Sequence, residues 1–303
     1  HAIQYAYGMA HEPWYWEATA TWIQEYVFPS HDWWAFYVEG FSSLPHLAMS
    51  ASSQQDYDVF MHMYGMSIFN FYLDEYVGGA DLVKDLWRYG QTHGTGYYDL
   101  FIGDAVDGED LDFSAIYDGF IATNAVMAYE AGPFPLVEQE DSTGSLPAAG
   151  GNDGNDKPQG YGQNYIKIST STVDESAPDL RLEFEGDSRQ DWSVLLVGVI
   201  EDEVVQVQKL SLSDSVGTGV LRNYGSFDVV WLVVSPLNTS TQGRSYTWDL
   251  QAIDGDTFED TGDAVDDEKR SAAACACSQG GQRVGMLPLL LLGLAVHRRR
   301  RVC

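Results

Sequence analysis

Histidine and acidic side chains crowd the first third of the chain, and these are the residue types that could do metal chemistry. Six of the seven histidines fall within the first 93 positions, namely His1, His11, His31, His46, His62 and His93. Imidazole and carboxylate groups are common ligands of zinc. Most of them are expected to be ordinary surface or core histidines, so the spacing between residues must identify those that form a site.

Other catalytic patterns are missing or incomplete. The sequence has no Gly-Xaa-Ser-Xaa-Gly elbow, P-loop or dinucleotide fingerprint, which argues against a serine hydrolase and a nucleotide enzyme. His11 is followed by a Glu but has no second His at the fifth place, and Pro13 breaks a helix there. A carboxylate–histidine cluster, with a solvated loop as the equal alternative, could come from Asp56, Asp58 and His62.

The opening, His1-Ala-Ile-Gln-Tyr-Ala-Tyr-Gly, looks like the second half of a HExxH zinc helix. In that motif two histidines one helical turn apart face the metal, and the Glu between them polarises the attacking water. If His1 is the second histidine, the first His and the Glu precede the sequence. Sixteen residues on, Trp14-Tyr-Trp-Glu-Ala-Thr-Ala-Thr-Trp places Glu17 on a following helix.

These two segments resemble the motifs of a group of secreted gluzincin metallopeptidases that is common in myxobacteria. The residues from Tyr64 to Tyr76 are similar to the helix that follows the third ligand in such enzymes. The resemblance spans roughly residues 1–132, more loosely the region after them, and then the C-terminus. It implies a Zn²⁺ cofactor with His1 and Glu17 as ligands, and small residues after Glu17 that let the zinc helices approach closely.

The resemblance also implies hydrolysis of peptide bonds in a protein or peptide substrate. Tyr64 could stabilise the oxyanion of the tetrahedral intermediate, although a buried helical tyrosine is the alternative. For Glu17 the alternative is a carboxylate favoured by the dipole at a helix N-terminus. Because the first His and the catalytic Glu have no counterpart here, we expect this chain alone to be inactive and to bind zinc weakly or not at all.

Residues 1–132 read as the helical C-terminal part of a zincin-like catalytic domain. Apolar residues at helical spacing predict a helix from Glu17, which Pro29 ends, and another over 64–76, closed by two glycines. Shorter helices are predicted over 80–89 and 112–130. Residues 133–160 are rich in Gly, Asp and Pro and predict a linker. A Ca²⁺ loop there is disfavoured, because the alternating ligands and final Glu of an EF-hand are missing.

Residues 161–253 carry short β-rich runs that predict an antiparallel β-sandwich of roughly seven strands. The fold class expected is therefore α+β and multidomain, with a mainly α-helical zincin subdomain followed by the sandwich. The sandwich region contains no histidine and is a poor place for transition-metal chemistry. A non-catalytic surface-binding or adhesion protein is the alternative function, with Trp231 or Trp248 touching a partner, although the strand pattern favours both in the core.

The C-terminal residues predict export. Residues 254–273 form an acidic tether, with eight acidic side chains among positions 254–268. Residues 274–303 carry Cys275 and Cys277, an apolar run over 284–296 and four arginines. This order resembles the tripartite sorting tags of myxobacteria, which implies cleavage by a sorting protease near the cysteines. The resemblance also implies transient membrane association through residues 284–296. The body would then be delivered to the cell surface, to the outer membrane of a Gram-negative cell or to the medium, and a plain tail anchor is the alternative.

Charge excludes one class of partner. Residues 1–268 hold 9 of the 16 basic residues and all 45 acidic ones, so their formal charge is 9 − 45 = −36. Such a body repels nucleic acid and anionic membranes. Cysteine is absent until Cys275, so no disulfide can link the two predicted domains.

Overall fold

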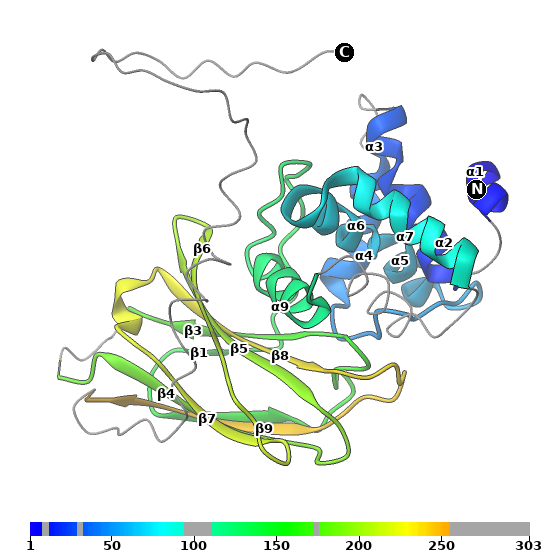
Figure 1. Cartoon of the computed structure of the whole chain (residues 1–303). Helices are drawn as coiled ribbons and strands as arrows, with labels where there is room; N and C mark the ends of the chain where they lie inside the picture. The colour runs from blue at the N-terminus through cyan, green and yellow to red at the C-terminus, as the bar shows by residue number, and fades with distance from the viewer. Residues whose placement is uncertain (8–11, 29–32, 94–110, 172–175, 255–303) are drawn as a thin grey trace, which may run out of the picture. The chain divides into compact units, whose positions relative to one another are not determined.

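A computed structural model describes residues 1–7, 12–28, 33–93, 111–171 and 176–254. All of them belong to one compact unit, His1–Gly262, and Figure 1 shows helices and two sheets within it. The helices are α1 (Ala2–Tyr7), α2 (Pro13–Trp22), α3 (Gln24–Val27), α4 (Trp33–Ser43), α5 (Tyr57–Gly65), α6 (Ser67–Tyr72), the π-helix η1 (Leu73–Val77), α7 (Gly79–His93), α9 (Phe113–Asn124) and the 3-10 turn η2 (Tyr224–Ser226).

The strands form two sheets that are antiparallel apart from one pair. They are β1 (Asp141–Thr143), β2 (Ala148–Asn152), β3 (Asn164–Ser169), β4 (Asp179–Gly186), β5 (Trp192–Ile200), β6 (Glu203–Lys209), β7 (Val216–Leu221), β8 (Val229–Pro236) and β9 (Tyr246–Ile253). One sheet has the order β1-β3-β8-β5-β6 and the other β2-β9-β4-β7. Only the short β1–β3 pair runs parallel.

Local sequence sets where the helices begin. Pro13 stands in the first turn of α2, where its missing N–H costs no hydrogen bond. Asp56 caps α5, accepting from the backbone N–H of Asp58 at 3.1 Å. Asp112 caps α9 in the same way, accepting from the backbone N–H of Ser114 at 2.9 Å. These short acceptors satisfy amides that have no partner within a helix.

Helices α4 and α5 pack closely because a glycine lies at each point of contact. A Cβ on Gly65 would come within 2.6 Å of the backbone oxygen of Tyr37. A Cβ on Gly40 would overlap the backbone of Met61. Any larger residue would push the two helices apart, so both glycines fix how the side chains of α4 and α5 meet.

Strand β5 of the five-stranded sheet is buried on both faces. Leu195 and Val197 of β5 belong to the core shared with the helices. Val194 and Leu196 of the same strand belong to the core between the sheets. This explains why β5 reads as a continuous apolar run rather than an alternating one.

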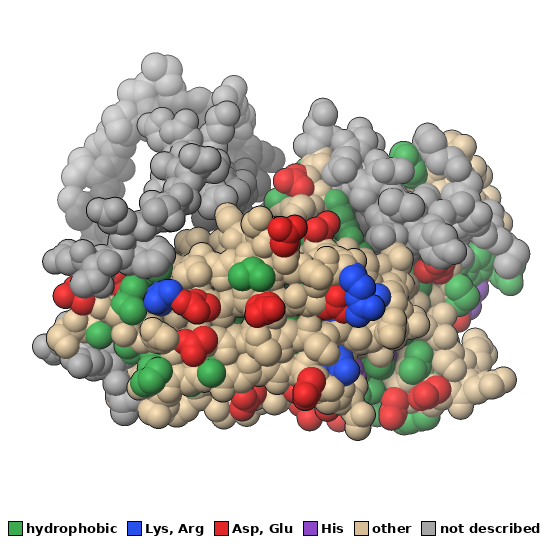
Figure 2. Space-filling view, turned by 90° about the horizontal axis from the view of Figure 1, so that it is seen from below, with side chains coloured by type: hydrophobic (Ala, Val, Ile, Leu, Met, Phe, Trp, Pro, Cys, Tyr) green, Lys and Arg blue, Asp and Glu red, His purple; other side chains and the backbone are tan. Residues whose placement is uncertain are grey.

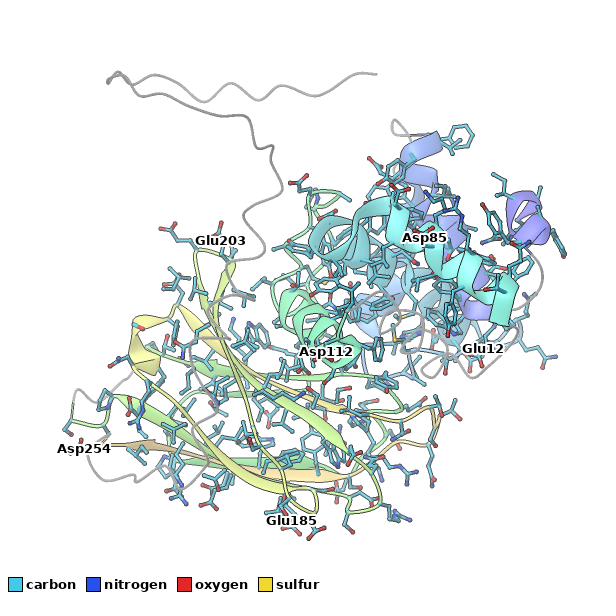
Figure 3. All side chains as sticks on the ribbon, viewed as in Figure 1. Glu12, Asp85, Asp112, Glu185, Glu203 and Asp254 are labelled. Atoms are coloured by element: carbon cyan, nitrogen blue, oxygen red, sulfur yellow. The ribbon has the colours of Figure 1, made fainter. Side chains whose placement is uncertain are left out.

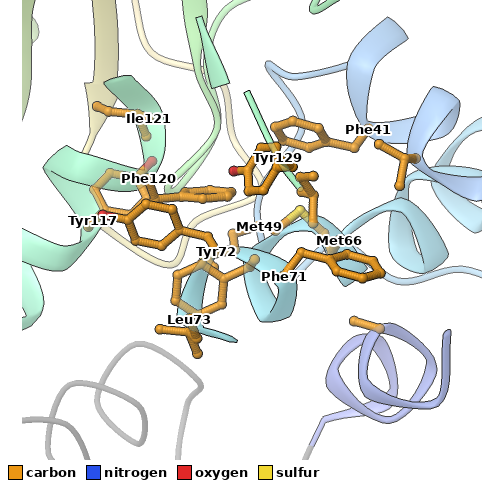
Figure 4. Close-up of a cluster of buried hydrophobic side chains, with 14 of the residues drawn as sticks. Phe41, Met49, Met66, Phe71, Tyr72, Leu73, Tyr117, Phe120, Ile121 and Tyr129 are labelled. Atoms are coloured by element: carbon orange, nitrogen blue, oxygen red, sulfur yellow. The ribbon is translucent and has the colours of Figure 1, made fainter. Parts of the chain in front are cut away.

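Helix α9 joins the helical region to this sheet through polar contacts as well as apolar ones. The hydroxyl of Ser193 on β5 donates to Asp118 at 2.6 Å. Lys209 of β6 donates to the other oxygen of Asp118, also at 2.6 Å. Phe120, on the same helix, packs its ring against that of Tyr72 at 5.6 Å between centroids (Figure 4).

The expected α+β class is confirmed in its coarse form: helices precede two mainly antiparallel sheets that pack as a sandwich. The segment 133–160, predicted as a linker, contains β1 and β2. The predicted helix after Glu17 is interrupted at Ile23, between α2 and α3. No helix in the described ranges is long and apolar enough to cross a membrane, and the run 284–296 lies outside those ranges.

Candidate functional site

Two side chains that the sequence singled out lie beside each other. The Nε2 atom of His1 is 3.2 Å from an Oε atom of Glu17. His1 precedes α1 and Glu17 lies on α2, so the contact joins two elements. The Glu17 side chain is 16% exposed and that of His1 is 48% exposed, which leaves the pair accessible from solvent.

The other ring nitrogen of His1 is also held. Its Nδ1 atom lies 2.6 Å from the amide oxygen of Gln4, a buried residue on α1. The amide nitrogen of Gln4 donates to the backbone oxygen of Trp16 at 2.8 Å. Since that donation fixes the amide orientation, the oxygen of Gln4 is left to accept from Nδ1–H. With Nδ1 donating to Gln4, Nε2 faces the Glu17 carboxylate. It donates to that carboxylate when it too carries a proton, and it offers a lone pair to a metal when it does not.

Tyr64 of α5 meets the same carboxylate. Burial raises the pKa of the Tyr64 phenol, and its hydrogen bond to Glu17 and the charge of Glu17 raise that pKa further. The phenol therefore stays protonated and lies beside the carboxylate, to which it can donate a hydrogen bond. The structure thus brings together His1, Glu17 and Tyr64, all three residues that the sequence nominated for a zinc centre.

The helix-terminus alternative for Glu17 does not fit the structure. Helix α2 begins at Pro13, and its first turn holds no acidic residue. Glu17 is the fifth residue of the helix, beyond the turn where the dipole acts most strongly. Its carboxylate is directed at His1 and Tyr64 instead.

The donor set suits a zinc ion in part. An imidazole nitrogen, with its tautomer fixed by a second residue, and a carboxylate oxygen are two ligands of the His, His, Glu type. No group of three or more His, Cys, Asp or Glu side chains that could hold a metal occurs among the described residues. A tetrahedral site would need a further protein ligand in addition to His1 and Glu17.

The rival cluster of Asp56, Asp58 and His62 does not assemble. Asp56 is used as the cap of α5. His62 is fully buried, and burial lowers the pKa of its imidazole to about 3. Neither of its ring nitrogens has a hydrogen-bond partner in the part of the chain that is described. His62 is thus a neutral core residue.

The proposed aromatic contacts of the sandwich are not available. Trp231 is 8% exposed and Trp248 is 4% exposed, so both belong to the core, as the strand pattern favoured. Cys275 and Cys277 lie outside the described residues.

Sequence reasoning missed the supporting residues of the site. Gln4 is three residues after His1, so the spacing that places both on one helical face could have found it. Tyr37 stacks on Tyr64 with 4.8 Å between ring centroids. That contact joins α4 to α5 and left no signal in the local sequence.

The surface around these elements is strongly acidic. Figure 2 shows carboxylates scattered over one face of the molecule with few basic side chains between them. The labelled Asp85 of α7, Glu185 of β4 and Glu203 of β6 show that both the helices and the sheets carry such groups (Figure 3).

Comparisons with known proteins find little. No family model and no curated protein matches the chain. Among solved structures, it is similar to the pre-peptidase C-terminal domain of collagenase from Bacillus anthracis. That similarity has a TM-score of 0.28 and 10% identity, and covers 40% of this chain and 100% of that one.

Proposed function

We propose that the protein is a zinc-dependent metallopeptidase of the gluzincin type, in which His1 and Glu17 are two of the metal ligands. The observation that carries the proposal is the convergence of His1, Glu17 and Tyr64 from three different elements. The first His and the general base of the HExxH motif would stand four and three residues before His1.

Each residue has a role that follows from its position. His1 can present its Nε2 lone pair to a metal because the amide oxygen of Gln4 accepts a hydrogen bond from Nδ1–H. Glu17 supplies a carboxylate oxygen at the same point. The bound zinc would polarise the scissile carbonyl and lower the pKa of a water. Tyr64, which keeps its proton, can donate a hydrogen bond to the oxyanion that forms on that carbonyl.

The experiment uses the protein extended upstream of His1 by about a domain's length. Cleavage of a generic protein substrate should be abolished by a zinc chelator and restored by added zinc. Glu17→Ala should remove the activity, whereas Glu39→Ala, an exposed glutamate on α4, should leave it unchanged. Zinc-dependent turnover by the 303-residue chain alone would contradict the assignment of the missing His and Glu.

The C-terminal residues extend the proposal to localisation. A sorting protease would cut near Cys275 and Cys277, and the body would then reach the cell surface or the medium. This part rests on the order of the cysteines, the apolar run 284–296 and the four arginines. Mass spectrometry of the surface-released protein should find a new C-terminus close to the cysteines, and a protein that keeps its arginines would contradict it.

A further inference from the structure

A row of aromatic rings leads from the candidate zinc centre to the solvent. Tyr64, which contacts Glu17, stacks on Tyr37 with 4.8 Å between centroids. Tyr37 meets Phe36 edge to face at 5.8 Å. Phe60 also packs against Tyr64, with 4.8 Å between centroids. We call Phe36, Tyr37, Phe60 and Tyr64 the aromatic ladder.

The close packing of α4 and α5 creates the ladder. Phe36 and Tyr37 come from α4, while Phe60 and Tyr64 come from α5. The contact of Gly65 with the backbone of Tyr37 brings the two helices near enough for the rings to stack. The ladder is therefore held by the rigid part of the fold, as a preformed binding surface requires.

The ladder is core on one side only: Phe60 and Tyr64 pack against the hydrophobic core, whereas Phe36 and Tyr37 continue the row towards the solvent. The buried side of α4 is formed by Trp34, Val38 and Phe41, at spacings of four and three residues. Phe36 is 56% exposed, and Tyr37, Phe60 and Tyr64 are only partly buried. A row of partly accessible rings that reaches the carboxylate of a proposed metal ligand is the type of surface that binds apolar ligand groups.

Helix α1, which follows His1, also carries apolar side chains. Ile3 is 75% exposed and Tyr5 is 61% exposed, both on α1. The ring of Tyr5 packs on Trp16 at 5.0 Å, and His1 stacks on the same indole at 6.1 Å. Exposed apolar side chains of α1 thus lie close in the chain to His1, in addition to the aromatic ladder.

We infer that the aromatic ladder binds an aromatic or large aliphatic side chain of the polypeptide substrate, beside the bond that is cut. This inference rests on the proposed peptidase function. It predicts substrates with exposed apolar residues, such as unfolded or extended chains, because folded proteins bury most of these side chains.

The first test is cleavage by the upstream-extended protein of two internally quenched, alanine-rich peptides that differ at one position, Phe against Ser. We expect kcat/KM to be roughly tenfold higher for the Phe peptide, with most of the difference in KM. Phe36→Ser should remove most of this preference. Leu136→Ser, which changes an equally exposed apolar residue outside the ladder (68% exposed), should keep it.

The second test does not need catalysis. Binding of acetyl-Ala-Ala-Phe-Ala-Ala-amide to the 303-residue chain, followed by NMR, should be at least several-fold tighter than that of the Ser peptide, and Phe36→Ser should abolish the difference. Zinc-dependent cleavage without a preference for Phe would contradict the binding role of the ladder and leave the proposed peptidase function standing. Phe-selective binding without zinc-dependent cleavage would overturn the peptidase and leave the ladder. Equal binding of both peptides would overturn the ladder in either case.

Discussion

The Nδ1 atom of His1 lies 2.6 Å from the side-chain oxygen of Gln4, and Gln4 is itself fixed by its donation to the backbone of Trp16. Each nitrogen of the imidazole therefore has a defined partner, since Nε2 faces Glu17. Ligand histidines in zinc proteins commonly have such a second contact, which orients the ring. Gln4 thus links helix α1 to the proposed metal ligand His1.

Replacing Gln4 tests that connection. Gln4→Ala should weaken zinc binding by the upstream-extended protein by about 10- to 100-fold, because His1 loses the group that fixes its tautomer. Competition with a chelator of known affinity measures the effect. Gln24→Ala, which removes another glutamine that donates to a helix backbone oxygen, is the matched control. Equal zinc affinities for the two variants would contradict the positioning role.

The packing of α4 against α5 gives a second prediction. Gly65→Ala should destabilise the protein by about 1–3 kcal/mol, because the new methyl meets the backbone of both Tyr37 and Phe41. Gly144→Ala should be nearly neutral, since its Cβ would meet nothing within 4 Å. Urea unfolding of both variants makes the comparison, and a Gly65→Ala protein as stable as the wild type would show that the helices can move apart freely.

The fully buried His62 predicts how stability depends on pH. Burial, assisted by the nearby His46, lowers its pKa from 6.5 to about 3 in the folded protein. Between these pH values the unfolded chain binds a proton that the folded chain does not. The free energy of unfolding should therefore fall as the pH drops from 6.5 towards 3, by at most about 1.4 kcal/mol per pH unit from this group.

His62→Met removes the titrating group and keeps a side chain of similar size. The variant should lose stability less steeply than the wild type over this pH range. Thermal or urea unfolding at several pH values measures the two slopes. Since the two proteins share every other titratable group, the difference between the slopes isolates His62, and identical slopes would contradict the assignment.

The link between α9 and the sheet predicts a contrast between two ion pairs. Asp118 accepts hydrogen bonds from Ser193 and Lys209 with its side chain 18% exposed. Asp118→Ala removes the acceptor of Ser193 and the counter-charge of Lys209, which keeps its hydrogen bond to Ser114, and should cost about 1–3 kcal/mol. Asp81→Ala breaks the exposed i,i+3 pair with Lys84 and should leave stability almost unchanged, because solvent screens this pair. Similar losses in urea unfolding would count against a structural role for Asp118.

Hydrophobic periodicity and composition were sufficient to predict several strands. The apolar run from Trp192 to Ile200 is β5, and the run around Val233 is β8. The segment of β7 carries no clear strand pattern in the sequence, because Gly217 and Gly219 interrupt it. β1 and β2 were missed because a segment rich in Gly, Asp and Pro has little strand propensity, and pairing with β3 and β9 decides its conformation.

The sequence predicted the individual residues of the candidate site, but not that they lie close together. Residue types and spacing nominated His1, Glu17 and Tyr64, but no local pattern shows that α1, α2 and α5 meet. That meeting depends on side-chain packing between elements, such as the ring of His1 on Trp16. Gly40 and Gly65 were unremarked in the sequence because the cost of a Cβ there is visible only once α4 lies against α5.

The most direct test of the zinc assignment is the metal content of the upstream-extended protein. Elemental analysis should find about one zinc per chain in the wild type and in Tyr64→Phe, because the phenol is not a ligand. Glu17→Ala and His1→Ala should each lose most of that zinc. A wild-type protein without zinc, or a Glu17→Ala protein that keeps a full equivalent, would contradict the account.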